Sequence, residues 1–211
     1  MAEKNPTDPV AVDALVWVAT NTPSNGLAPD NPHFKALSIL TRDHIQSDKL
    51  GPLVERLPYD LDEGSQKFLR AVAEKNPSRN IRGKAYLVLA QQAENRLQVA
   101  HEFKDNPDLA KSYESNFRKK MVEELVKADL DKLNKEAQAR YERLAKDYSD
   151  LSAGQVGTMK RLAEIKLEAL RHPIVIGKPA PEIEGEGIDG KKLKLSDYRG
   201  KVVLLDFWGN W

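Results

Sequence analysis

Cysteine is missing from this 211-residue sequence. The chain can therefore form no disulfide, bind no metal through thiolates and use no cysteine as a nucleophile. Its four histidines are scattered without the spacing of a metal site, and isolated histidines of this kind usually lie at a surface or a core edge; they are His33, His44, His101 and His172. We therefore expect neither a metal nor another cofactor.

Long uncharged apolar runs are also missing, although 40% of the residues are hydrophobic and 31% are charged. We expect a globular chain without a membrane span. The formal net charge of +1 creates no overall field that would attract nucleic acid, so we expect no nucleic-acid partner. The opening letters MAEKNPTDP lack the apolar centre of a signal peptide. Localisation is left open, and it would be extracytoplasmic or periplasmic if a longer parent protein carried such a signal upstream.

The spacing of apolar residues changes near His172. Before this point they recur at helical spacing in three groups, which are Leu37, Leu40 and Ile45, then Phe68, Leu69 and Val72, then Tyr86, Leu87 and Leu89. After Pro173 the pattern consists of glycine-rich turns and alternating strands. Such a change is typical of a domain boundary. We predict a helical-repeat domain over residues 1–172 and a second domain over residues 173–211.

An internal repeat lies in the first part. The stretch AEKNPTDPVAVDALVWVA from Ala2 aligns without gaps with AEKNPSRNIRGKAYLVLA from Ala73, and apolar positions coincide on one helix face. The separation is about twice the roughly 35 residues of a helix-pair repeat, which favours an α-solenoid of tetratricopeptide-like character. The alternative is chance recurrence of a short EKNP helix exit. Before the second copy, SQKFLRAV predicts an amphipathic helix whose counterpart would precede residue 1, so we expect the sequence to continue upstream.

From Asn106 to about residue 151 the pattern predicts one long charged helix or a pair of helices. An apolar stripe at three- and four-residue spacing comprises Val126, Leu130, Leu133, Ala137, Tyr141, Leu144, Tyr148 and Leu151. Such a stripe could be a coiled-coil or partner-binding seam, but it is more often the core face of a packed helix, which we favour. The stretch TMKRLAEIKLEALR then predicts one more amphipathic helix.

Three glycines in the second part form a literal G-x-G-x-x-G pattern, Gly185, Gly187 and Gly190. Taken alone, this pattern would suggest a dinucleotide site, but that site needs a strand before the glycines and a helix after them. Here Asp189 and Gly190 instead form the signal of a two-residue hairpin turn between alternating residues. We interpret the glycines as turn residues. Farther on, residues 202–207 form a short β-branched and aromatic run that predicts a buried central strand.

Residues 177–211 resemble the opening of redoxin domains, the thioredoxin-like group that includes AhpC/TSA peroxiredoxins and TlpA/ResA-type thiol-disulfide oxidoreductases. The resemblance rests on Gly177, Pro179, Ala180, Pro181, Asp189-Gly190-Lys191, Leu195-Ser196-Asp197-Tyr198, Gly200-Lys201 and residues 202–211. Together with the internal repeat, it predicts a mostly α fold in which a TPR-like helical region precedes the first β-strands of a truncated thioredoxin-like α/β domain. In the TlpA-like branch a C-x-x-C pair follows directly, so the catalytic cysteines are expected beyond Trp211.

The resemblance also assigns the flank of that active site to Asp206, Phe207, Trp208 and Trp211. Asp206 matches a buried acid implied to move protons to or from the cysteine pair, although it could simply be a polar residue near a strand end. Trp208 and Trp211 would shape substrate docking or merely pack. Because Phe207 and Trp208 replace the threonine-rich loop of typical peroxiredoxins, disulfide exchange is favoured over peroxide reduction.

The function implied is that of a thiol-disulfide oxidoreductase, of which this chain is a fragment and not itself an enzyme. The implied partners are protein thiols or disulfides, with a further protein partner on the helical repeats. Two alternatives stay open. One is a scaffold or interaction protein whose redoxin domain is inactive, and the other is a peroxiredoxin-type peroxidase.

Overall fold

The computed structural model describes residues 8–22, 31–114, 119–174 and 177–208. The chain divides into two compact units, Met1–Arg171 and His172–Trp211, and each is described here by itself. The first unit is helical, and the second contains two short antiparallel strands. The expected mostly α fold with a small amount of β structure near the C-terminus is therefore confirmed.

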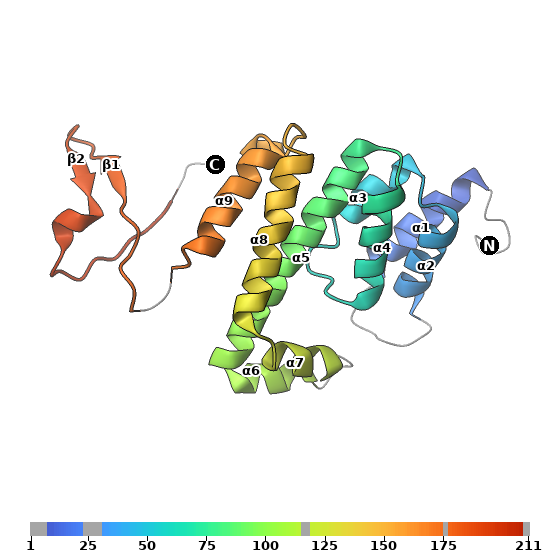
Figure 1. Cartoon of the computed structure of the whole chain (residues 1–211), viewed down its shortest axis with the longest axis horizontal. Coiled ribbons are helices and arrows are strands. Elements are labelled where there is room, and N and C mark those ends of the chain that lie inside the picture. Colours follow the sequence, from blue (N-terminus) through green and yellow to red (C-terminus); the bar gives the residue numbers. More distant parts are fainter. Residues whose placement is uncertain (1–7, 23–30, 115–118, 175–176, 209–211) are drawn as a thin grey trace. The chain divides into compact units, whose positions relative to one another are not determined.

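Nine α-helices are described in the first unit (Figure 1). They are α1 (Pro9–Asn21), α2 (Pro32–Asp43), α3 (Gly51–Val54), α4 (Glu63–Lys75), α5 (Arg79–Asp105), α6 (Pro107–Tyr113), α7 (Lys119–Val126), α8 (Leu130–Asp147) and α9 (Met159–Arg171), with short 3₁₀ turns η1 (Asp48–Leu50) and η3 (Gly154–Val156) between them. Helix α5 lies between α4 and α8 and packs on both (Figure 1).

Polar caps and prolines fix where most of these helices begin. The side chains of Asp8 and Asn31 accept backbone N–H bonds at the starts of α1 and α2, and a proline occupies the first turn of each helix. Asp62 and Ser78 cap α4 and α5 in the same way. Each cap provides an acceptor for an amide that has no partner within its helix, so the breaks between helices are encoded locally.

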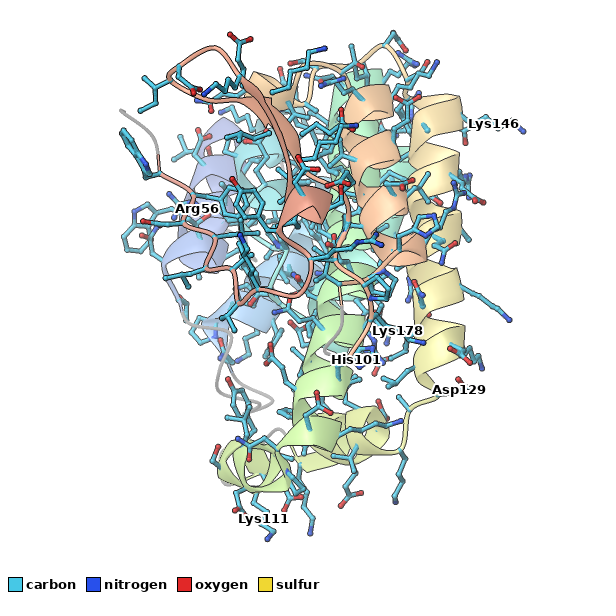
Figure 2. All side chains as sticks on the ribbon, turned by 90° about the vertical axis from the view of Figure 1, so that its left-hand side faces the viewer. Arg56, His101, Lys111, Asp129, Lys146 and Lys178 are labelled. Atoms are coloured by element: carbon cyan, nitrogen blue, oxygen red, sulfur yellow. The ribbon has the colours of Figure 1, made fainter. Side chains whose placement is uncertain are left out.

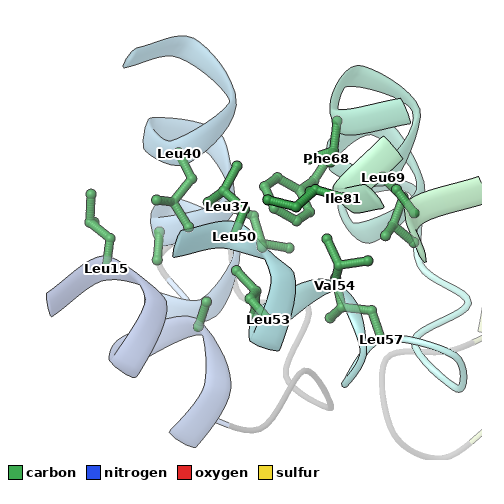
Figure 3. Close-up of a cluster of buried hydrophobic side chains, with 14 of the residues drawn as sticks. Leu15, Leu37, Leu40, Leu50, Leu53, Val54, Leu57, Phe68, Leu69 and Ile81 are labelled. Carbon is green, nitrogen blue, oxygen red and sulfur yellow. The ribbon is translucent and has the colours of Figure 1, made fainter. Parts of the chain in front are cut away.

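Helices α1 to α5 share one hydrophobic core (Figure 3). Leu37 and Leu40 of α2 are buried in it together with Phe68 and Leu69 of α4. The helical spacing read from these residues is confirmed. The short 3₁₀ turn η1 also contributes to this core, since Leu50 at its end is fully buried.

A second core joins α5, α8 and α9. Ala137, Tyr141 and Leu144 are fully buried in it, and Leu133 and Tyr148 pack against it. The apolar stripe is therefore mainly the core face of a helix, as favoured, although Val126 is exposed. In the described parts of the segment from 107 to 151 there is neither one helix nor a pair but three helices, α6, α7 and α8. The chain breaks before α8 because the Asp129 side chain caps its first turn.

The two copies of the repeat both form helices, α1 and α5, and the tetratricopeptide-like interpretation is consistent with this arrangement. Helix α5 extends to Asp105, well past Ala90, where the aligned stretch ends. The additional turns carry Ala100 and Phe103 into a third small core with α6 and α7.

The second unit contains a hairpin of β1 (Glu184–Glu186) and β2 (Lys192–Lys194), followed by the 3₁₀ turn η4 (Leu195–Tyr198). Glu186 pairs with Lys192, and beyond this pair the Gly187 amide donates to the Lys191 carbonyl at 2.8 Å. The Gly190 amide closes a turn onto the Gly187 carbonyl, and Gly190 has a φ of 74°. The expected hairpin is present, but its turn is not the two-residue type. Three residues form the loop, and the last of them is the left-handed Gly190, which is typical of a G1 bulge.

Residues 202–207 are not a strand in this structure, which corrects the expectation of a buried central strand. They carry no regular secondary structure, and Val202 and Leu204 are almost fully exposed. A β-strand forms only when a neighbouring strand satisfies its backbone groups. The one sheet among the described residues has two strands, β1 and β2, and neither pairs with this run.

Candidate functional site

Residues 202–208 hold three of the four residues assigned to the redox flank. Asp206, Phe207 and Trp208 are all exposed, and Trp208 retains 84% of its surface. Asp206 makes no hydrogen bond or ion pair within the part of the chain that the structure describes. The fourth, Trp211, lies outside the described residues. The structure does not gather the three described side chains, Asp206, Phe207 and Trp208, into a pocket.

The hairpin that precedes them is held by a carboxylate that the sequence did not single out. Glu182 Oε1 accepts hydrogen bonds from the Ser196 amide at 3.0 Å and from the Ile183 amide at 3.2 Å. These bonds, that to Ser196 foremost, lower the pKa of the Glu182 carboxyl. The Leu195 amide donates to the Ile183 carbonyl at 2.9 Å, so the first residue of η4 is bonded to the residue that precedes β1. The sequence contains no local pattern that predicts this contact, because Glu182 and Ser196 lie on opposite arms of the hairpin.

A pocket of about 230 Å³ lies in the first unit, where α4, α5 and α8 face one another. Its walls are Gln66 and Arg70 of α4, Leu89, Gln92, Ala93 and Arg96 of α5, and Glu136 and Arg140 of α8. Three guanidinium groups thus meet a single carboxylate, so the lining carries an excess of positive charge. The charged groups of the lining are thus the guanidinium groups of Arg70, Arg96 and Arg140 and the carboxylate of Glu136.

The polar groups of this pocket are only partly satisfied. Arg140 Nη2 contacts Glu136 Oε1 at 2.7 Å, but Arg140 Nε is buried without a partner. Gln92, which is 2% exposed, donates from Nε2 to the carbonyls of Leu57 and Asp60 at 2.8 Å each. These two bonds fix the orientation of the amide, and its Oε1 is left buried without a donor.

Arg70 and Arg96 add the remaining cations. Arg70 Nη2 donates to Gln66 Oε1 at 3.0 Å, whereas Arg96 has neither a hydrogen bond nor an ion pair in the described parts of the chain. A guanidinium group matches the two oxygens of a carboxylate or phosphate through parallel hydrogen bonds. The arrangement is therefore suited to holding an anionic group.

Sequence reasoning missed this pocket, although a signal is present. Each arginine follows a glutamine or glutamate by four residues, in QKFLR, QAENR and EAQAR, so that each pair lies on one helix face. The three pairs come from three different helices. Only the packing of α4, α5 and α8 brings them together.

The described residues were searched for groups that could bind a metal ion and for helices that could cross a membrane. Within them, no three histidine, aspartate or glutamate side chains are grouped in a way that could hold a metal ion. None of the described helices combines the length and the apolar character needed to cross a bilayer.

Comparison with known proteins relates a short region of this chain to thiol-disulfide oxidoreductases. The chain is 50% identical over 36 residues to the thiol-disulfide oxidoreductase ResA of Bacillus thuringiensis subsp. konkukian (strain 97-27), which is 17% of this chain and 21% of that protein. For ResA of Geobacillus thermodenitrificans (strain NG80-2) the identity is 42% over 38 residues, 18% of this chain and 22% of the relative. For ResA of Bacillus subtilis (strain 168) it is 49% over 35 residues, 17% and 20% respectively.

The chain spans about a fifth of the length of the curated relatives that it matches. The matched length is close to that of residues 177–211, which carry the redoxin resemblance. No family model matches the chain, and no solved structure matches it. The chain thus contains a region related to thiol-disulfide oxidoreductases.

Proposed function

We propose that residues 173–211 belong to a redoxin-type domain that performs thiol–disulfide exchange. The identity of 50% with ResA over 36 residues is the observation that carries this proposal. The hairpin from β1 to β2, which forms among the residues of the resemblance, supports it. The cysteine pair that the chemistry needs is not supplied by these 211 residues.

The exchange reaction proceeds in two displacements. A cysteine thiolate attacks one sulfur of a substrate disulfide, forms a mixed disulfide and releases the first substrate thiolate, which takes up a proton. The second cysteine then attacks the mixed disulfide and releases the second substrate thiol. The substrate gains two electrons and two protons, and the cysteine pair becomes a disulfide. Asp206 is assigned the movement of a proton to or from the pair, and Trp208 and Trp211 the contact with substrate.

A chimera tests this proposal directly. The 36 matched residues of Bacillus thuringiensis ResA are replaced by their counterparts from this chain, and reduction of insulin by dithiothreitol is followed. We expect the chimera to keep a rate within about tenfold of the parent, because the segment supplies an equivalent part of the domain. A chimera with the same residues in scrambled order is the control. If the intact chimera were as inactive as the scrambled one, the proposal would fail.

The substitution Asp206→Asn in the chimera tests whether Asp206 transfers a proton or is only a polar residue near a strand end. Loss of a proton-transfer group lowers the rate by about 100-fold or more and changes the pH–rate profile. A polar residue with no part in proton transfer would leave that profile unchanged when replaced by the isosteric amide.

We further propose that residues 1–172 form a helical domain that positions a protein partner of the exchange reaction. The arginine-lined pocket supports this role, since it would accept an acidic side chain of that partner. The inactive-scaffold alternative shares this binding role and differs only in the missing exchange chemistry.

The binding role is tested with a fluorescein-labelled hexaglutamate peptide, whose anisotropy is measured with the full chain at low salt. Arg96→Gln should weaken binding by about tenfold. Lys146→Gln removes the same charge from the last turn of α8, where the side chain extends away from the helices (Figure 2), and should change binding little. Equal losses in the two variants would show bulk charge attraction instead of a pocket.

A further inference from the structure

The first helix of the chain carries an apolar face that no described residue covers. Val10, Ala14 and Trp17 follow one another at four- and three-residue spacing, so they lie on one side of α1. Val10 and Trp17 each remain 66% exposed, and Ala14 is exposed as well. The other side of α1 is in the core, where Leu15 and Ala19 are buried. Helix α1 is thus apolar on both sides but packed on one.

The internal repeat shows what such a face does elsewhere in the same molecule. In the alignment of the two copies, Val10, Ala14 and Trp17 correspond to Ile81, Ala85 and Val88 of α5. These three residues are at most 6% exposed. They are buried in the core that contains Phe68, Leu69 and Val72 of α4, and α4 packs directly on α5.

The opposite sides of the two helices correspond equally well. Leu15 and Ala19 of α1 align with Tyr86 and Ala90 of α5. The first pair belongs to the core between α1 and α2, and the second to the core between α5 and α8. Each repeated helix therefore packs its Leu15 or Tyr86 side on the helices that follow it. Among the described residues, the other side is covered only in the second copy, where α4 packs on α5.

We propose that the face of α1 formed by Val10, Ala14 and Trp17 is a docking surface for an amphipathic helix with the apolar pattern of α4. The occupant presents an aromatic residue, a leucine one position later and a β-branched residue one turn further on, as Phe68, Leu69 and Val72 do. Continuity with the packing of α4 on α5 selects this occupant over others. Since Ala73 aligns with Ala2, residues 63–71 have no counterpart within the 211 residues.

A peptide of residues 61–77 serves as the probe, because it is the one sequence known from this molecule to cover an equivalent face. It is titrated into the full chain carrying Trp208→Phe and Trp211→Phe, which leaves Trp17 as the only tryptophan. We expect saturable binding with a blue shift of Trp17 emission, as its indole leaves water. Helical circular dichroism should rise above the sum of the two components, because a peptide of this length is largely unfolded alone.

Two matched variants test the surface itself. Ala14→Glu places a charge in the centre of the face and should reduce peptide affinity by at least about tenfold, while the melting temperature of the chain stays unchanged because Ala14 is exposed. The peptide carrying Phe68→Asp and Leu69→Asp should not bind. A peptide that failed to shift Trp17 emission at about 1 mM would overturn the proposal.

Sedimentation velocity of the chain without peptide identifies a different occupant. The proposal expects a monomer whose Trp17 emission is that of an exposed indole. A dimer that Ala14→Glu dissociates would show that a second copy of the chain occupies this face, and the proposal would be wrong.

Discussion

The hydroxyl of Tyr141 donates a hydrogen bond to Glu94 Oε2 at 2.6 Å and thereby links α8 to α5. The other carboxylate oxygen, Glu94 Oε1, contacts Lys166 Nζ of α9 at 2.8 Å. The Tyr141 side chain is fully buried in the core that these three helices share. A single carboxylate at the core edge therefore satisfies a buried hydroxyl and ties the last helix of the unit to the bundle.

Tyr141→Phe keeps the ring in the core and removes only this hydrogen bond. We expect the free energy of unfolding to fall by about 1.5–3 kcal/mol, the usual range for a hydrogen bond to a charged group. Urea denaturation measures this change. Tyr59→Phe is the control, since Tyr59 is 83% exposed and should alter the midpoint little. Equal effects in the two variants would contradict a special role for the Tyr141 hydroxyl.

The same residue makes stability depend on alkaline pH. Burial, followed by the hydrogen bond to Glu94, raises the pKa of the Tyr141 hydroxyl far above its usual value of 10.0. Above about pH 10 the unfolded chain loses this proton while the folded chain keeps it. The contribution of Tyr141 is thus complete below pH 10 and is lost as the pH rises beyond it, by up to about 1.4 kcal/mol per pH unit.

Denaturation of the wild type and of Tyr141→Phe at pH 9 and pH 11 isolates this effect, because other titrating groups are common to both proteins. The wild type should lose more stability than the variant between the two values. Identical losses would show that Tyr141 ionises as easily in the folded protein as in the unfolded one.

Gly83 allows α5 and the end of α8 to come close together. A Cβ added at Gly83 would collide with Leu151 Cδ1 and lie 3.1 Å from Tyr148 Cδ1. Gly83→Ala should lower the free energy of unfolding by about 1–2 kcal/mol, although alanine favours a helix by roughly 1 kcal/mol. Gly51→Ala is the matched control, because its Cβ would meet Ile81 at an ordinary 3.9 Å. Adding Leu151→Ala to Gly83→Ala should cost less than the sum of the two single changes, and strict additivity would contradict the proposed collision.

The sequence was informative wherever a local pattern determines structure. The spacing of Leu37, Leu40, Phe68 and Leu69 identified core helices, since one face of a helix must recur every three or four residues. The Asp189-Gly190 signal located the hairpin, but it gave the wrong loop length, because the bond from Gly187 to Lys191 depends on both strands.

Contacts between distant segments were beyond such reasoning. Asn76 donates to the carbonyls of Ile45 and Ser47 and accepts from the Ser78 amide, so the second EKNP copy holds a loop in place as well as ending a helix. The arginine-lined pocket was missed for the same reason. Residues 202–207, where a strand was expected, have side chains that favour β structure. No described strand pairs with them, and this preference alone does not form a sheet.

The amide hydrogens of residues 202–207 should therefore exchange rapidly. None of these amides makes a backbone hydrogen bond in the described structure, whereas Leu195 donates to Ile183 and Gly187 donates to Lys191 in the hairpin. Amides without a structural partner exchange at rates close to those of an unfolded peptide, and those of a core helix exchange only through larger openings. Mass spectrometry of the deuterated chain should show three levels of protection, highest in α5, intermediate in the hairpin and lowest in residues 202–207.

The chain must first be shown to be monomeric, because an apolar run with unpaired edges can pair with another copy. Slow exchange across residues 202–207 in a verified monomer would mean that this run has a backbone partner, and its description as an irregular run without backbone hydrogen bonds would then be wrong.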